Sequence, residues 1–252
     1  MMKNMAALTI DHTIFSAEVE GSVCILTFKE KPLLYVTDLK EKKDLFDFLE
    51  LLSQHDEIKV LLIKSAPVKM RCQEYINFYR NKISCAADIQ AFNRKYNALC
   101  QLTQILTELN KVIVHADSGN VLLLHLNVGL ACDYRIISEN TIYQNPNVDL
   151  NVIPTGGCVY FLSKILGRAT AFELLLSRDE ISASRAHELG LVDEVVPKRS
   201  LDQIALEKAH SFAELSLGYC IGIKKLLNSG IGELNRFLEY EHSVLVRSHK
   251  QR

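Results

Sequence analysis

The chain has 252 residues, of which 48% are hydrophobic, and its 29 basic and 30 acidic residues give a formal charge of −1. A chain of this length can bury one substantial core, and its interspersed charges exclude the basic surface typical of proteins that bind nucleic acid or membranes. The seven cysteines form no CxxC pair, and no apolar segment approaches the roughly 18 residues that cross a bilayer, so we expect a cytoplasmic protein with neither a zinc site nor membrane contacts.

The first half of the chain predicts alternating strands and helices. In order, these are a hairpin at 14–19 and 23–28, a helix capped by Thr37, a strand at 60–63, a helix at 89–109 and a strand at 112–114. Such a series forms stacked units of two strands and a helix. Right-handed crossovers would wind these units into a spiral.

The second half continues the pattern and ends in helices. It predicts strands at 130–137 and 141–144, a helix from Gly156-Gly157 to Gly167, a helix at 169–176, a helix from Ser182 to Gly190 and a strand at 192–196. Two further helices, 205–215 and 234–245, flank a glycine-containing stretch. We therefore expect an α/β core in residues 1–200 and a C-terminal helical region in residues 201–252.

Several phrases in the second half form a recognisable series. They are ACD at 131–133, NP at 145–146, IPTGG at 153–157, LGR at 166–168 and ISASRAHELGLVDEVVP at 181–197. Over about 70 residues this series resembles the enoyl-CoA hydratase/isomerase (crotonase) family. The resemblance implies a crotonase-like ββα spiral core, a C-terminal helical cap or trimerisation region, and a homotrimer or hexamer. It also implies an acyl-CoA thioester as substrate and no other cofactor.

In this family, two backbone N–H groups stabilise the enolate oxygen of the thioester. Aligned on Ala131-Cys132-Asp133, the family's three glycines fall on Leu123-Leu124-His125, and one donor would be the N–H of Leu124. The second donor falls between Cys72 and Glu74, and we place it at Glu74. Leucine in place of glycine would crowd the thioester, so the resemblance implies a rebuilt loop or an altered pocket.

Both positions that carry a catalytic glutamate in the family's hydratases hold asparagine here, at Asn127 and Asn147. An amide cannot exchange a proton near neutral pH, so we do not expect ordinary two-glutamate hydration. Asp149 and Glu74 are candidate replacement bases. A solvated loop carboxylate and an exposed helix-start carboxylate are the alternative interpretations of these two residues.

Basic side chains near the first hairpin and the first oxyanion loop are the candidates for binding coenzyme A phosphates. The candidates are Lys31, Lys69 and Arg71, with Cys72 beside them, and a role as ordinary solvated side chains is the alternative for each basic residue. Cys158 and His125 are candidate nucleophile and base, although a packing role is the usual one for both.

Three functional hypotheses follow. The first is an enzyme of fatty acid metabolism, a lyase or isomerase, that stabilises the enolate of an acyl-CoA or acyl-carrier thioester. The second is a non-catalytic paralogue that serves as a binding or assembly subunit. The third is a hydrolase on the same fold that uses Cys158 or His125.

Overall fold

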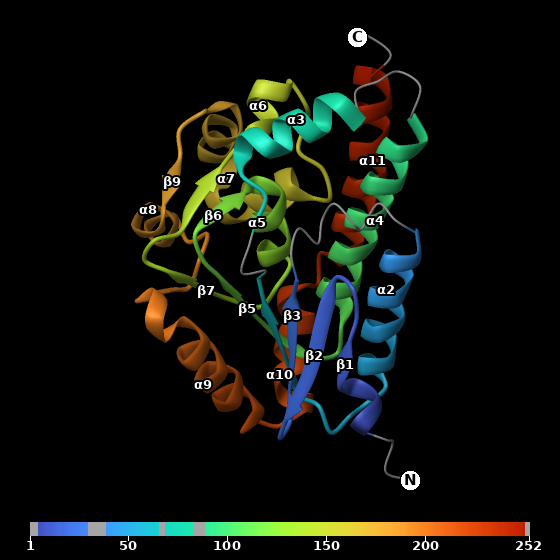
Figure 1. Cartoon of the computed structure of the whole chain (residues 1–252), viewed down its shortest axis with the longest axis vertical. Coiled ribbons are helices and arrows are strands. Elements are labelled where there is room, and N and C mark those ends of the chain that lie inside the picture. The colour runs from blue at the N-terminus through green and yellow to red at the C-terminus, as the bar shows by residue number, and fades with distance from the viewer. Residues whose placement is uncertain (1–4, 30–38, 66–68, 83–88, 250–252) are drawn as a thin grey trace.

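The computed structural model describes residues 5–29, 39–65, 69–82 and 89–249, and the predicted cap Thr37 and the candidate Lys31 lie outside these ranges. Its main sheet has the strand order β1-β2-β3-β4-β5-β7-β10 (Figure 1). The strands are β1 (Ile10–Asp11), β2 (Phe15–Glu20), β3 (Val23–Phe28), β4 (Val60–Lys64), β5 (Val112–Asp117), β7 (Tyr134–Ser138) and β10 (Glu194–Val196). β1, β2 and β3 are antiparallel, whereas β3, β4, β5, β7 and β10 are parallel. The predicted hairpin is confirmed.

A second sheet joins β6 (Asn120–Leu122), β8 (Ile142–Gln144) and β9 (Ile181–Ser182). β6 and β8 are parallel, and β8 and β9 are antiparallel. Helix α5 (Leu123–Leu130) begins at the residue after β6. This junction brings the first turn of α5 to the edge of the small sheet.

The remaining helices surround the two sheets. They are η1 (Met5–Leu8), α2 (Leu39–Ser53), α3 (Cys72–Lys82), α4 (Ile89–Glu108), α6 (Pro146–Leu150), α7 (Cys158–Leu176), α8 (Ala183–Glu188), η2 (Lys198–Ser200), α9 (Leu201–Ala213), α10 (Leu217–Leu227) and α11 (Ile231–His249). α11 lies alongside α4, and α9 packs across β3, β4 and β5 (Figure 1). The proposed division near residue 200 stays a prediction.

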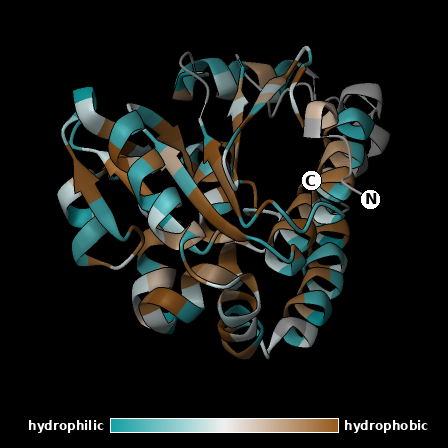
Figure 2. Ribbon diagram, turned by 90° about the horizontal axis from the view of Figure 1, so that it is seen from below, coloured by the Kyte–Doolittle hydropathy of each residue, from teal (hydrophilic) through white to brown (hydrophobic). Residues whose placement is uncertain are grey.

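The main sheet is buried on both faces because alternate side chains of its strands point in opposite directions. Cys24, Leu26 and Leu61 belong to the core that contains α2 and α4. Val23 and Leu62 belong to the core formed with α9. Hydrophobic residues accordingly dominate the central strands, and hydrophilic residues appear on the surrounding helices (Figure 2).

Two predicted elements differ from the structure. The strand expected from Leu130 begins only at Tyr134, because Leu123–Leu130 forms the buried helix α5, and a short apolar run does not distinguish a helix from a strand. The glycine-containing stretch forms the helix α10, which the sequence interpretation missed. The helix break at Gly167 is confirmed, since this residue interrupts α7 with φ of 74°.

The hydroxyl of Ser182 accepts a hydrogen bond from the N–H of Arg185 and caps α8, as predicted.

Within the described ranges, no helix combines the length and the apolar character needed to cross a membrane.

Candidate active site

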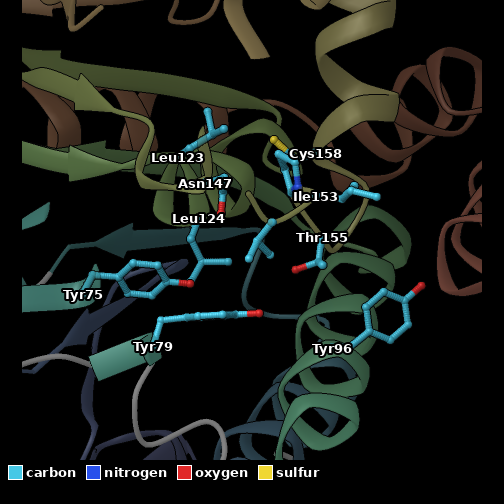
Figure 3. A pocket seen from close by; sticks show the side chains of 11 residues that line it. Tyr75, Tyr79, Tyr96, Leu123, Leu124, Asn147, Ile153, Thr155 and Cys158 are labelled. Carbon is cyan, nitrogen blue, oxygen red and sulfur yellow. The ribbon is translucent and has the colours of Figure 1, made fainter. Parts of the chain in front are cut away.

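A small cavity lies where α3, α4 and the first turn of α5 meet the segment 152–158. Its volume is about 20 Å³, which is room for about one water molecule. Tyr75 and Tyr79 extend from α3 toward Leu124, with Ile153 and Thr155 on the other side (Figure 3). The full lining is Tyr75, Tyr79, Tyr96, Leu123, Leu124, Asn147, Val152, Ile153, Pro154, Thr155 and Cys158.

The first turn of α5 opens on this cavity. The N-cap residue is Leu122, which is extended, with φ of −72° and ψ of 149°, and makes no side-chain cap. The amides of a helix's first turn have no partner inside the helix, and the helix dipole makes them a favourable site for a negative oxygen. Leu124, the predicted oxyanion donor, lies in this turn and lines the cavity. Its half-buried side chain lies among the residues that line the cavity (Figure 3).

Asn127 lies one turn further along α5 and is buried. Its Nδ2 donates to the carbonyl oxygen of Gly156 at 2.7 Å and to that of Thr155 at 3.4 Å. Its Oδ1 is buried and has no hydrogen-bond partner in the described part of the chain. Asn127 is not among the cavity-lining residues, so its amide fixes the backbone behind the cavity wall.

Asn147 does line the cavity. It lies in α6, whose N-cap Asn145 accepts a hydrogen bond from the Asn147 N–H at 3.3 Å through its side-chain oxygen. The side chain of Asn147 is half-buried. Of the two asparagines at the family's glutamate positions, Asn147 is therefore the one placed to contact a ligand.

The two candidate bases lie on the surface. Asp149 is exposed, and its Oδ1 is 2.8 Å from Nε of Arg178. Glu74 is exposed in the first turn of α3, where its Oε2 accepts a hydrogen bond from the Arg71 N–H at 3.5 Å, as a helix-capping carboxylate does. The cavity-lining residues of the described chain include no carboxylate. The base roles of Asp149 and Glu74 stay predictions that this geometry does not support.

A buried carboxyl group that the sequence interpretation missed lies behind the cavity. Glu241 of α11 accepts hydrogen bonds from the N–H groups of Gly156, at 3.0 Å, and Gly157, at 3.3 Å. Burial raises its pKa to about 7, against the opposing effect of these hydrogen bonds. The burial of Glu241 could have been inferred from the sequence, because Glu241 continues the helical spacing of the buried residues Leu234 and Leu238.

The two candidate residues of a hydrolase differ in their relation to the small cavity, which Cys158 lines and His125 does not. Cys158 is buried at the start of α7, and burial raises the pKa of its thiol, so the thiolate is disfavoured. His125 is half-buried and does not line the cavity. The structure therefore favours the packing role for Cys158.

A second and larger cavity, of about 650 Å³, lies at the carboxyl ends of β3, β4 and β5. Parallel sheets commonly bind ligands at this end of their strands. The cavity lining includes four basic residues, Lys64, Lys69, Arg71 and Lys198, and two acidic residues, Asp117 and Asp202.

Lys69 is buried in this cavity's wall and pairs with the carboxylate of Asp117. Its Nζ also donates to the carbonyl oxygen of Ser118 at 2.6 Å, and burial lowers its pKa to about 7. Arg71 is exposed and lines the same cavity, whereas the half-buried Cys72 lines neither cavity. Lys69 and Arg71 thus line the same cavity, and their role in binding coenzyme A stays a prediction.

Comparison with known proteins gives the family. The family model described as enoyl-CoA hydratase/isomerase matches residues 18–236. A probable mitochondrial enoyl-CoA hydratase 2 from Arabidopsis thaliana is 26% identical over 189 residues, which are 75% of this chain and 62% of the plant protein. The fatty acid oxidation complex subunit alpha of Vibrio cholerae is 34% identical over 139 residues, which are 52% of this chain and 19% of that protein. The chain thus spans less than two thirds of either relative's length.

The fold matches solved structures over nearly the whole chain. The enoyl-CoA hydratase from Bacillus halodurans superposes with a TM-score of 0.80 at 19% identity, over 94% of this chain and 96% of that one. Pseudomonas aeruginosa DspI superposes with a TM-score of 0.73 at 19% identity, over 94% of this chain and 89% of that one. These likenesses show the crotonase fold. With the family match from residue 18 to residue 236, they place the chain in the enoyl-CoA hydratase/isomerase family.

Proposed function

We propose that the chain binds an acyl thioester with its carbonyl oxygen at the first turn of α5 and stabilises the corresponding enolate there. The observation that carries this proposal is the helix start itself. Leu122 provides no side-chain cap, and both Leu123 and Leu124 line an apolar cavity. A negative oxygen is most strongly stabilised by backbone N–H groups where water is excluded.

The absence of a carboxylate among the described cavity residues restricts the reaction. Hydration by a pair of glutamates requires one base and one acid at the double bond, and the family positions carry Asn127 and Asn147. Decarboxylation of a β-carboxylated thioester needs the enolate to be stabilised but needs no base. We therefore place this reaction first among the lyase and isomerase reactions of the family.

Binding requires the cavity to open, because about 20 Å³ does not hold an acyl group. Tyr75, Tyr79 and Leu124 fill the space beside the first turn of α5 (Figure 3). Rotation of these three side chains would enlarge the space beside the first turn of α5. The phosphates of coenzyme A would then lie in the basic cavity, near Arg71 and Lys198.

A second candidate function, as a non-catalytic binding or assembly subunit, is favoured by the same small volume. The exposed apolar residues of α10 add to it, since Tyr219, Leu226 and Leu227 are 62%, 76% and 80% exposed. Exposed apolar residues gathered on one helix are typical of an interaction site. We propose that this helix joins copies of the chain into a homotrimer or hexamer, which both candidate functions accommodate.

A test of the first function removes the N–H of Leu124 without breaking α5. Proline is tolerated in the first turn of a helix, so Leu124→Pro deletes the donor, while Leu124→Ala deletes the side chain and keeps the donor. Saturated, α,β-unsaturated and β-carboxylated CoA thioesters would be incubated with each protein, and binding and product masses would be followed. Loss of one oxyanion donor lowers kcat by about 10²-fold to 10³-fold.

Turnover that Leu124→Pro abolishes and Leu124→Ala retains supports the enolate function. No product and no thermal stabilisation from any thioester would support the assembly function instead, because a bound ligand raises the melting temperature. For the basic cavity, Arg71→Glu and Lys198→Glu should weaken CoA binding. The exposed neighbour Arg199 lies outside the cavity lining, so Arg199→Glu is the matched control.

A further inference from the structure

Glu241 of α11 is a buried carboxyl group behind the small cavity. Its side chain is 5% exposed, and its oxygens accept hydrogen bonds from the N–H groups of Gly156 and Gly157 at the start of α7. The next residue, Cys158, and the preceding residue, Thr155, both line the small cavity. Glu241 therefore lies one layer of backbone behind the cavity wall.

The Gly156 backbone is held by three helices. Its carbonyl oxygen accepts a hydrogen bond from Nδ2 of Asn127 in α5, at 2.7 Å, and another from the hydroxyl of Thr103 in α4, at 3.0 Å. Its N–H donates a hydrogen bond to Glu241 of α11. Gly156 and Gly157 have φ of 76° and 83°, and residues other than glycine rarely adopt such positive φ values. A Cβ on Gly156 would lie 2.9 Å from Nδ2 of Asn127, so a side chain does not fit at this position without a shift of its neighbours.

We propose that Glu241 is a positioning residue of the candidate site, whose carboxyl group holds the Gly156-Gly157 turn, and with it the cavity wall from Ile153 to Thr155, in the closed arrangement. This inference rests on the proposed function only for its consequence on ligand binding. The closure itself is a property of the chain without a ligand.

The surroundings of Glu241 favour its neutral form. Tyr96 and Cys100 face it from α4, and Cys158 faces it from α7. His242, its neighbour on α11, stacks on the ring of Tyr96. The groups that act on the pKa of Glu241 are burial, which raises it, and the amides of Gly156 and Gly157 with the hydroxyl of Tyr96, which lower it.

The sign of the pH dependence follows from these surroundings. In the closed arrangement the carboxyl has a pKa of about 7, whereas in an open, solvated arrangement it returns toward 4.5. The closed state therefore binds the proton more tightly, and raising the pH shifts the equilibrium toward the open state. Between pH 5 and pH 8 the opening constant rises on the order of 50-fold.

Amide hydrogen exchange of the ligand-free protein tests this. The protection of the peptide spanning 153–158 would be measured by mass spectrometry from pH 5 to pH 8 and corrected for intrinsic exchange, with the β4 peptide as an internal reference for global unfolding. We expect wild-type protection to fall roughly 50-fold over this range. Glu241→Gln keeps an acceptor for Gly156 and removes the titration, so its protection should show no such slope.

The exposed Glu239, on the same helix, gives the matched control Glu239→Gln, which should follow the wild type. Loss of the slope in Glu241→Gln supports the proposal whether its protection is high or low. A wild type without a slope, or a Glu241→Gln variant with the wild-type slope, overturns it. In a second arm, the affinity for a CoA thioester should rise with pH in the wild type only. If no thioester binds at any pH, the proposed function fails while the exchange result still decides the role of Glu241.

Discussion

The side-chain amide of Asn127 donates to the carbonyl oxygen of Gly156 at 2.7 Å, at the position where family hydratases carry a catalytic glutamate. A carboxylate at this position could not donate to Gly156, and it would face the oxygen of Thr155 as well. The amide of Asn127 thus supports this backbone by donating hydrogen bonds that a carboxylate cannot donate. In this chain Asn127 holds the Gly156 backbone, and it does not line the small cavity.

Asn127→Asp should therefore destabilise the fold, although it only replaces the NH2 group of the side chain by an oxygen. Two donated hydrogen bonds are lost and a buried charge faces carbonyl oxygens, which costs about 2–4 kcal/mol. Urea unfolding at pH 7 would measure this. Asn147→Asp, at the half-buried cavity position, is the control and should change the free energy of unfolding by less than about 1 kcal/mol. Equal stability of the two variants would contradict the structural role of Asn127.

Lys224 anchors α10 to the core through its charge. Its Nζ lies 2.9 Å from the Asp133 carboxylate and donates to the carbonyl oxygens of Leu106 and Lys111. Lys224→Met leaves these acceptors without their donor, and we expect a loss of about 2–4 kcal/mol in the free energy of unfolding. The exposed neighbour Lys225 provides the control, since Lys225→Met should unfold at nearly the wild-type urea concentration.

Acid should destabilise the protein through His115. This side chain is buried in β5, and burial, with the nearby charges of Lys69 and Arg135, lowers its pKa to about 3. The unfolded chain takes up the proton near pH 6.5 and the folded chain does not, so stability falls as the pH drops from 6.5 toward 3. The limiting loss is about 4–5 kcal/mol.

Urea unfolding at pH 7, 5 and 4 checks this expectation. His115→Gln should lower the stability at pH 7 and flatten the acid slope. His187→Gln changes an exposed histidine and should keep the wild-type slope. An unchanged slope in His115→Gln would assign the acid sensitivity to other groups.

The apolar face of α10 should determine the oligomeric state. Leu227 is 80% exposed in the single chain, and a charge placed there opposes burial against another copy. Leu227→Lys should lower the molar mass measured by light scattering and leave the free energy of unfolding of the separated chain unchanged within about 0.5 kcal/mol. A wild type that is already monomeric at micromolar concentration would contradict the homotrimer proposal.

Elements set by short-range interactions were predictable from the sequence. Ser182 caps α8 three residues away, and the hairpin of β2 and β3 closes over two residues, so local patterns suffice for both. Helix α10 was missed because Gly218 and Gly222 lower its local preference for helix, and tertiary contacts such as that of Lys224 compensate.

Some residues of the candidate site could likewise be predicted from the sequence, and others could not. Leu124 was chosen as an oxyanion donor from the aligned motif, and the structure has it lining the cavity in the first turn of α5, a helix that was not predicted. The contact of Glu241 with Gly156 joins residues 85 positions apart and depends on how α11 packs, which no local pattern encodes. Asp149 looked like a base from its spacing, but its side chain turns to Arg178 on the surface.

The long separation between Glu241 and Gly156 has a consequence for biosynthesis. While the ribosome is still adding α11, Gly156 and Gly157 have been synthesised but Glu241, which accepts hydrogen bonds from their two amides, has not. The cavity wall can close only after α11 has been added, 85 residues beyond the glycine turn, so the candidate site should mature later than the strands that precede this turn.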